Sequence, residues 1–150
     1  DNSIYGLTKG QVSPTSPMGM KSGTSPYGNI ARPLNPTTLA LAYGATFVAR
    51  TFSRERDMVS DLITRAIQHK GFSFIHDLSP CVVFNKDVTY GSVNSVTAQL
   101  PEEHDILDRS NAMSLAESTE PVYQGLFFQE KIPSFDDHVK QVKDGLNKSD

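Results

Sequence analysis

The fold is decided by residues 46–78, TFVARTFSRERDMVSDLITRAIQHKGFSFIHDL. Each end of this stretch is a short apolar run, Thr46–Thr51 and Phe72–Leu78, and both runs predict buried β-strands. Between them apolar residues recur at the spacing of one helix face: Met58, Val59, Leu62, Ile63, Ala66 and Ile67. Strand, helix and strand joined by short connections predict a βαβ unit, in which the two strands run parallel.

The segments around this unit predict further elements. Asn35-Pro36 predicts a helix start, because Asn is a favoured N-cap and Pro fits the first helical position. Ser53 is the expected N-cap of the helix in the deciding stretch, and Lys70-Gly71 its end. The other expectations are a buried strand over 3–7, an irregular stretch over 79–101, a helix over 105–118, a strand over 124–130 and a helix capped by Ser134. Together they predict an α/β fold of three layers, in which helices flank a mostly parallel sheet.

Composition and charge exclude several classes of protein. The chain has 150 residues, the size of one ordinary domain, and its 37% hydrophobic and 21% charged residues predict a folded, soluble protein. A net charge of −3 without a long basic run argues against nucleic acid as the main partner. The sequence has no apolar stretch near the ~20 residues that span a bilayer, and no signal-peptide pattern. One cysteine cannot form an internal disulfide or hold a zinc ion or metal cluster alone.

The segment Gly10–Thr38 differs in composition from the rest of the chain. Of its 29 residues, 17 are Gly, Pro, Ser or Thr, and they follow no helical or strand period. A long loop of this kind in a compact domain is usually functional or disordered. Two interpretations are open: an ordered loop over a ligand, or a mobile linker.

Few residues carry a pattern of known chemistry. The glycine-rich nucleotide-binding motifs and the nucleophile-elbow motif are absent. The four histidines lack metal-ligand spacing; we expect His69 and His138 to be solvated on helix surfaces, and His76 to be a hydrogen-bonded core or edge residue. Ligands of open α/β sheets bind beyond the carboxyl ends of the strands, which directs attention to the loops after Leu7, Thr51 and Leu78.

Two positions at these loops are candidates for metal binding. The side-chain oxygen of Asn2 and a backbone carbonyl two residues later suit Mg²⁺, which fills its octahedron with phosphate oxygens and water. Cys81 follows Ser79-Pro80 at the end of a predicted strand, where a thiolate can face a metal site. The alternatives are an ordinary turn residue for Asn2 and a small buried apolar residue for Cys81.

Taken together, these residues resemble one family, the thiamine-diphosphate-binding β subunit of 2-oxoacid:ferredoxin oxidoreductases, closest to the 2-oxoglutarate type. The most specific run is DNSIYGLTKGQVSPTS at residues 1–16. Further matching blocks follow in order and extend the resemblance over nearly the whole chain: Ser25–Gly28, Arg32–Pro36, Gly44–Arg50, His69–Ser73, Leu78–Cys81, Glu103–Asp105 and Gly125–Phe128.

The resemblance implies oxidative decarboxylation of a 2-oxoacid with coenzyme A as acyl acceptor, and electrons that leave through a [4Fe–4S] cluster to ferredoxin. The cofactor site would include Asn2, Ile4, Tyr5 and Gly6, with Mg²⁺ bound by the Asn2 side chain and the Ile4 carbonyl oxygen. Leu7 and Lys9 would border the substrate pocket, where Lys9 would pair with the distal carboxylate of 2-oxoglutarate. Cys81 would be one cluster ligand. The implied partner is the α subunit of the same enzyme, and the implied location is the cytoplasm.

Departures from the family pattern qualify this expectation. A Gly-Asp-Gly-Asp segment and three further cysteines, which lie upstream of the Asp-Asn motif in the family, are absent, and the chain starts at Asp1-Asn2 without methionine. We therefore expect the carboxyl-terminal portion of a thiamine-diphosphate-binding domain with incomplete sites. Its parts would be a cofactor strand and loop (1–9), a Gly/Pro/Ser-rich loop (10–34), a βαβ core (35–78), a cluster-ligand loop (79–104) and a helix–strand–helix end (105–150).

Two alternatives stay open at this point. One is a non-catalytic module that binds a partner subunit, and the other is a subunit of a pyruvate- or indolepyruvate-type oxidoreductase. The stretch Asp87–Gln99 fits the family poorly, and its role is open.

Overall fold

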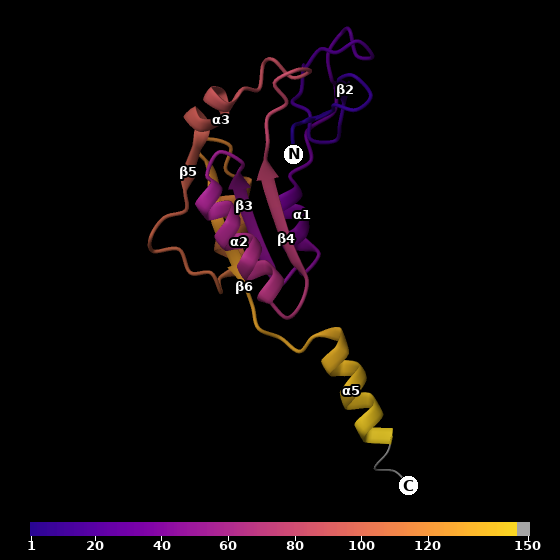
Figure 1. The fold of residues 1–150 in the computed structure, drawn as a ribbon, viewed down its shortest axis with the longest axis vertical. Coiled ribbons are helices and arrows are strands. Elements are labelled where there is room, and N and C mark those ends of the chain that lie inside the picture. Colours follow the sequence, from indigo (N-terminus) through magenta and orange to yellow (C-terminus); the bar gives the residue numbers. More distant parts are fainter. Residues whose placement is uncertain (147–150) are drawn as a thin grey trace.

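The computed structural model describes residues 1–146, and Figure 1 shows their arrangement. Within this range the strands form a four-stranded sheet in the order β4-β3-β6-β5 and a separate small pair, β1 with β2. The elements in chain order are β1 (Ile4–Tyr5), β2 (Gln11–Val12), α1 (Pro36–Ala42), β3 (Phe47–Phe52), α2 (Arg56–Gln68), β4 (Ser73–Leu78), α3 (Tyr90–Val96), β5 (Thr97–Gln99), α4 (Arg109–Glu117), β6 (Val122–Gln129) and α5 (Phe135–Leu146).

Strand β3 is the centre of the main sheet. All six of its residues are buried, and it pairs in parallel with β4 over its whole length, from Phe47 with Ser73 to Phe52 with Leu78. On its other side it pairs antiparallel with β6, with a bulge between Val48 and Ala49. Strand β5 then pairs in parallel with β6. The predicted βαβ unit is confirmed. The sheet is mostly parallel, because two of its three strand pairings are parallel.

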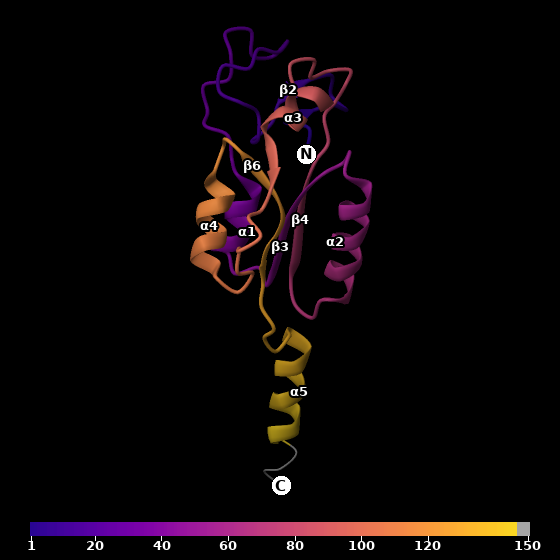
Figure 2. The same cartoon turned by 90° about the vertical axis from the view of Figure 1, so that its left-hand side faces the viewer.

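Helices cover both faces of this sheet, as Figure 2 shows: α1 and α4 lie on one side and α2 on the other. The larger core cluster lies under α1 and α4 and consists of Ala40, Leu41, Ala45, Val48, Ala112, Ala116, Phe127 and Phe128. A second cluster lies under α2 and consists of Phe47, Ala49, Leu62 and Leu126. Successive side chains of β3 therefore pack into the two clusters on opposite faces of the sheet. The predicted three-layer α/β fold is confirmed.

The first residues of α1 and α2 depend on local hydrogen bonds, and the sequence predicted the N-cap of α1 but not that of α2. Asn35 caps α1 as predicted, since its side-chain oxygen accepts hydrogen bonds from the N–H groups of Thr37 and Thr38. Ser53 does not cap α2: its N–H donates to the Leu78 carbonyl at 3.0 Å and so continues the β3–β4 ladder. The N-cap of α2 is Glu55, whose side chain makes no capping bond.

The expectation of an irregular stretch over 79–101 was wrong in its second half. Helix α3 is held by a capping box between Thr89 and Ser92, and β5 follows it directly. Both elements are short, and neither has the regular apolar spacing from which a helix or strand can be predicted. The helix expected over 105–118 begins only at Arg109, because Asp108 caps it through the N–H groups of Ser110 and Asn111.

The buried strand expected over 3–7 was also wrong. Only Ile4 and Tyr5 are extended, and they pair with Gln11 and Val12 in a hairpin outside the main sheet. Ile4 is 5% exposed, whereas Leu7 at the hairpin turn is 99% exposed. The loop after Leu7 is therefore the tip of this hairpin and not the carboxyl end of a strand of the main sheet.

The Gly/Pro/Ser-rich loop is tied to the hairpin by side chains. Ser16 is fully buried, and its hydroxyl donates to the Ser3 carbonyl. The Asn29 amide donates to the carbonyls of Ser16 (3.0 Å) and Pro17 (3.3 Å). These bonds favour the ordered interpretation of this segment.

At the other end of the body, α5 projects away from the sheet (Figures 1 and 2), and none of its described side chains is buried. Ser134 caps it as predicted: the Asp137 N–H donates to the Ser134 hydroxyl at 3.2 Å, and Ser134 donates back to the Asp137 carboxylate. Hydrogen bonds from the Ser134 N–H and from the Ser134 hydroxyl to the Asp137 carboxylate hold the pKa of Asp137 below its usual value. Within residues 1–146 no helix is both long and apolar enough to cross a bilayer.

The core under α2 predicts a large effect of one substitution. Leu62 is 3% exposed, so Leu62→Ala should lower the free energy of unfolding by about 2–5 kcal/mol through lost burial and a cavity. Ile67→Ala on the same helix, where the side chain is 80% exposed, should change it by less than about 0.5 kcal/mol. Urea unfolding followed by circular dichroism measures both, and equal effects would contradict the assigned core.

Candidate functional site

The amino-terminal segment lies at the carboxyl end of β4, where Figure 1 places the N-terminus. The backbone N of Asp1 donates to the Asp77 carbonyl, and the Ser79 N–H donates to the Asp1 carbonyl at 2.8 Å. The Asp1 carboxylate accepts hydrogen bonds from the Ser3 N–H at 2.9 Å and the Thr15 hydroxyl at 2.8 Å. This end of the sheet is the place where the fold positions ligands in open α/β proteins.

Three of the predicted site residues meet here, and one of them, Cys81, is far from the other two in sequence. A side chain added at Gly6 would lie 3.6 Å from the Asn2 amide nitrogen and 3.9 Å from the Cys81 sulfur. The Asn2 carbonyl accepts a hydrogen bond at 3.0 Å from Asn85, which is 2% exposed. The hairpin and the loop after β4 are thus joined at Asn2, Gly6 and Cys81.

The thiol of Cys81 lies in a setting that favours its ionised form. Its sulfur accepts a hydrogen bond from the Phe84 N–H at 3.5 Å. Hydrogen bonds from the backbone N–H groups of Phe84 and Val83 hold the pKa of this thiol below its ordinary value. The cysteine is free and partly exposed, so the small-buried-residue alternative does not apply.

A tight turn presents Leu7 and Lys9 to solvent. The Lys9 N–H donates to the Gly6 carbonyl at 3.1 Å, and the Gly10 N–H donates to the Tyr5 carbonyl at 3.0 Å. Lys9 has a positive φ of 73°, and Gly10 follows at 92°, a conformation that favours glycine. Gly10 is buried, and the Cβ of Phe84 would lie 3.4 Å from a side chain there. The turn is therefore packed against the cysteine loop.

A buried polar network lies beneath the hairpin. His76 contacts the Asp1 carboxylate through Nε2 at 2.9 Å and the Thr37 hydroxyl through Nδ1 at 3.2 Å. Arg50, 3% exposed on β3, donates to the same hydroxyl at 3.2 Å and to the Asn35 side chain at 3.2 Å. Burial lowers the pKa of His76 to about 4, with repulsion from Arg50 as the second cause. Burial also lowers the pKa of Arg50, to about 10.

A surface cavity of about 590 Å³ opens over this network and is lined by Asp1, Asn35, Arg50 and His76 among others. Within residues 1–146, no three His, Cys, Asp or Glu side chains come together as a metal site. The side-chain oxygen of Asn2 accepts the Ile4 N–H at 3.0 Å and keeps a second lone pair for a cation. The donors present fit part of a Mg²⁺ site and one of the four thiolates of an iron–sulfur cluster.

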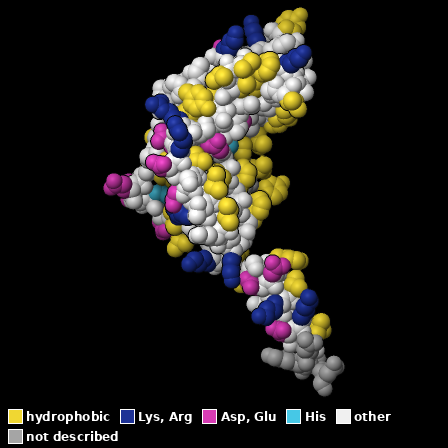
Figure 3. Space-filling view, in the orientation of Figure 1, with side chains coloured by type: hydrophobic (Ala, Val, Ile, Leu, Met, Phe, Trp, Pro, Cys, Tyr) yellow, Lys and Arg dark blue, Asp and Glu magenta, His cyan; other side chains and the backbone are white. Residues whose placement is uncertain are grey.

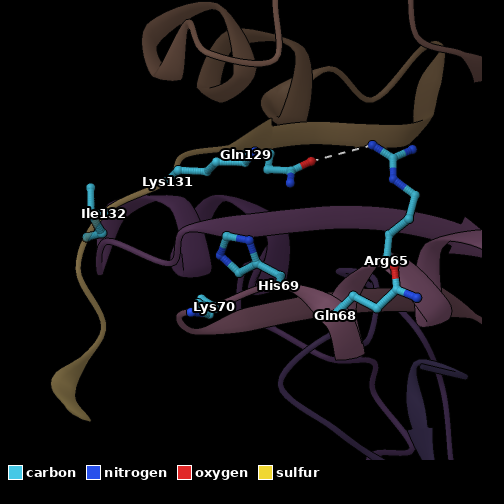
Figure 4. Close-up of a pocket in the computed structure, with 7 residues that line it drawn as sticks. All are labelled: Arg65, Gln68, His69, Lys70, Gln129, Lys131 and Ile132. Carbon is cyan, nitrogen blue, oxygen red and sulfur yellow. Dashed lines mark hydrogen bonds between the residues drawn. The ribbon is translucent and has the colours of Figure 1, made fainter. Parts of the chain in front are cut away.

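Another cavity, of about 440 Å³, lies at the opposite end of the sheet (Figure 4). Its lining is basic and includes Arg65, Lys70 and Lys131, but none of the predicted site residues. His69 lies there with its Nε2 2.8 Å from the Thr46 hydroxyl and its ring 5.6 Å from that of Phe47. His69 is half-buried at the end of α2, so the expectation of a solvated histidine holds only in part.

The other two histidine predictions are confirmed. His138 is exposed on α5, and both ring nitrogens of the buried His76 have polar neighbours.

Comparison with known families decides the assignment. The family model of the thiamine pyrophosphate enzymes, C-terminal TPP binding domain, matches residues 1–76. The chain belongs to this family. A second model, which describes the C-terminal part of the pyruvate ferredoxin oxidoreductase beta subunit, matches residues 81–144. The two matches divide the chain just after β4, and the resemblance read from the sequence is confirmed.

Relatives at the level of whole sequences are β subunits of an oxidoreductase complex. The 2-oxoacid:ferredoxin oxidoreductase subunit beta of a Sulfolobus species is 35% identical over 93% of this chain and 50% of its own length. The 2-oxoglutarate synthase subunit KorB of Methanocaldococcus jannaschii is 34% identical over 97% of this chain and 54% of its own length. The chain spans about half the length of these relatives.

A solved structure agrees closely in fold. It is the 2-oxoglutarate:ferredoxin oxidoreductase from Magnetococcus marinus with 2-oxoglutarate, coenzyme A and succinyl-CoA bound. The similarity has a TM-score of 0.94 at 38% identity and covers 98% of this chain and 51% of that chain. The names of these relatives describe them as subunits of larger enzymes.

Sequence reasoning missed the polar network and the residues that fix the hairpin. Arg50, Asn85 and Ser16 are all buried, and each holds a backbone or side-chain group of the site region. Arg50 gave a signal: a charged residue inside an otherwise apolar strand must have buried partners. Asn85 and Ser16 gave none, since both stand among loop residues of ordinary composition.

The low pKa of His76 predicts a pH dependence of stability. An unfolded histidine has a pKa near 6.5, so between about pH 4 and 6.5 the unfolded chain binds the extra proton. The free energy of unfolding should therefore fall as the pH drops through this window, by at most about 1.4 kcal/mol per pH unit from this residue. Urea unfolding at pH 5 and pH 7 measures the difference in the free energy of unfolding between the two pH values. This difference should be smaller for His76→Gln than for the unaltered chain, and the same as in the unaltered chain for His138→Gln. Equal pH dependence in all three proteins would rule out His76 as the cause.

Proposed function

We propose that this chain supplies the carboxyl-terminal part of the β subunit of a 2-oxoacid:ferredoxin oxidoreductase, with 2-oxoglutarate as the preferred substrate. The reaction is the oxidative decarboxylation of the 2-oxoacid with coenzyme A as acyl acceptor. The observation that carries the proposal is the approach of two segments that are far apart in the sequence: Gly6 lies beside both the Asn2 amide and the sulfur of Cys81 in the loop after β4. The proximity of a candidate cofactor-binding residue and a candidate cluster ligand, beyond the carboxyl end of β4, supports the proposal.

The cofactor part of the site is assigned to the hairpin. Asn2 and the Ile4 carbonyl would hold Mg²⁺, and Tyr5 and Gly6 would border the cofactor. When bound, thiamine diphosphate supplies the stabilisation of the carbanion left by decarboxylation. The chain's own contribution is rigidity: Asn85 fixes the Asn2 backbone, and Ser16 fixes Ser3 next to it. A neutral donor set holds Mg²⁺ weakly, so an additional carboxylate from the rest of the enzyme is part of the proposal.

Substrate selection is assigned to the turn that carries Leu7 and Lys9. The positive φ values of Lys9 and Gly10 and the packing of Gly10 on Phe84 fix the turn against the cysteine loop, with the Lys9 side chain exposed. The ammonium of Lys9 would pair with the distal carboxylate of 2-oxoglutarate, a charge that pyruvate lacks. The naming of several relatives as 2-oxoglutarate enzymes supports this preference.

Electron transfer is assigned to Cys81 and a [4Fe–4S] cluster whose other three thiolates come from outside this chain. Backbone N–H groups directed at the sulfur stabilise a thiolate and tune the potential of a cluster that it binds. Ferredoxin as the electron acceptor, an α subunit as partner and a cytoplasmic location complete the proposal. They rest on the resemblance and on the names of the relatives.

Lys9→Ala tests the substrate assignment in the assembled enzyme. Loss of the ammonium should raise the KM for 2-oxoglutarate about tenfold or more, and change the KM for pyruvate less than twofold, because one desolvated charge contact is worth roughly 1.5–3 kcal/mol. Lys21→Ala, at an exposed lysine of the neighbouring loop, is the matched control and should change neither value. Equal effects of Lys9→Ala on both substrates would remove this residue from specificity.

Cys81→Ser tests the cluster assignment. Serine keeps the size of the side chain but is a poor cluster ligand, so the iron content and visible absorbance of the assembled enzyme should fall by more than half. Ser79→Ala, two residues earlier in the same loop, should keep both at the level of the unaltered enzyme. Full iron content in Cys81→Ser would contradict the role of this thiol.

A further inference from the structure

The cavity shown in Figure 4 takes no part in the proposed reaction. It lies where the main sheet begins: Gln129 of its lining pairs with Phe47, the first residue of β3, and Lys70 of its lining precedes β4. The candidate cofactor site lies beyond the opposite, carboxyl end of β4. Six residues of β3, at about 3.3 Å each, place roughly 20 Å between the two. The cavity is therefore a separate location on the molecule.

Cations from two segments that are far apart in the sequence converge on this cavity. Arg65 and Lys70 come from α2 and the turn that follows it, and Lys131 follows β6. Among the seven residues that line the cavity, all within the described part of the chain, none is an aspartate or a glutamate. In the orientation of Figure 1, Figure 3 shows Lys and Arg side chains at the lower end of the body, next to the start of α5. Like charges that face one space repel each other, and an anion between them removes this repulsion.

The carboxamide of Gln129 is turned so that it adds a donor to this lining. Its oxygen accepts a hydrogen bond from the Arg65 guanidinium at 3.5 Å. Figure 4 shows its nitrogen on the side that faces His69 and Gln68. An amide nitrogen only donates, so the cavity presents the N–H groups of Gln129, Arg65 and the two lysines to a ligand. His69 is held in place there, with Nε2 2.8 Å from the Thr46 hydroxyl.

Local pairing explains part of this positive charge but not all of it. Cations are favoured at the carboxyl end of a helix, which accounts for Arg65 and Lys70 near the end of α2. Arg65 also lies 3.5 Å from the Asp61 carboxylate, although both side chains are exposed, and such pairs contribute little. Asp137 at the start of α5 attracts Lys70. Lys131 belongs to a different segment, and in the described part of the chain it makes no ion pair.

We propose that this cavity is a second binding site, for a small polyanion whose phosphate or carboxylate groups lie close together. Its volume of about 440 Å³ is in the range of small-molecule sites and holds a molecule the size of a diphosphate or a tricarboxylate. The ligand supplies the counter-charge that the cavity lacks, which explains why Lys131 is gathered with Arg65 and Lys70. The site uses none of the residues assigned to the cofactor, the substrate or the cluster, so the inference goes beyond the proposed function.

Calorimetric titration of the full chain with inorganic pyrophosphate, and separately with citrate, in buffer freed of divalent cations, tests the proposal. At an ionic strength of about 20 mM we expect one site with a Kd below about 1 mM for one or both anions. At about 0.15 M salt this Kd should be at least about fivefold higher, because salt screens the charges. Binding of pyrophosphate alone would assign phosphate groups to the ligand, binding of citrate alone would assign carboxylates, and binding of both would show that the site recognises charge density.

Matched lysine substitutions locate the bound anion. Lys131→Gln should weaken binding about fivefold or more, and Lys140→Gln, at a lysine of α5 that is also exposed, should not change it. Asn2→Ala should leave binding unchanged as well, which separates this site from the proposed cofactor site. The proposal is overturned if neither anion binds with a Kd below about 1 mM, if both lysine substitutions weaken binding equally, or if Asn2→Ala abolishes it. None of these results depends on the proposed activity.

Discussion

The positive charge of Arg50 in the middle of a fully buried strand is the constraint on which the rest of the structure depends. A buried guanidinium is tolerated only when its donors are satisfied. Here they reach the Thr37 hydroxyl, the Asn35 side chain, and the carbonyls of Tyr123 and Ala116, at 3.1 to 3.2 Å. These acceptors belong to the start of α1, to β6 and to the end of α4. One side chain thereby fixes how three elements approach the central strand.

The same charge connects the core to the candidate site. Arg50 and His76 share the Thr37 hydroxyl, and His76 in turn contacts the Asp1 carboxylate. Because His76 is buried and Arg50 beside it is charged, a positive charge on His76 is unfavourable, and the imidazole stays neutral at pH 7. A neutral ring can join a hydroxyl to a carboxylate and so hold the hairpin over the sheet. The polar network is therefore both a structural support of the fold and the base of the site.

How much of this the sequence could predict depended on whether the signal was local. The βαβ unit followed from apolar spacing, and the α1 start from Asn35-Pro36, because both patterns lie within a few residues. Helix α3 and strand β5 were missed since their short runs have no apolar period, and pairing with β6 decides them. Ser53 was assigned to a helix cap on its residue type, but a bond across the sheet to Leu78 determines its conformation. In the site, Asn2 and Cys81 were candidates by residue type and position, and Gly6 was added by the resemblance to a family. Their support by Asn85 and Ser16 depends on contacts that no local pattern encodes.

The packing of Gly10 against Phe84 has a consequence for motion at the site. It joins the hairpin tip to the cysteine loop, and the bond from Asn85 to the Asn2 carbonyl joins the base of the hairpin to the same loop. Two segments joined in this way lose and gain order together. A ligand that immobilises the turn around Lys9 thus lowers the entropic cost of ordering the loop around Cys81, and the reverse holds to the same extent. Ligand binding at the Lys9 turn and ordering of the Cys81 loop are in this sense thermodynamically coupled.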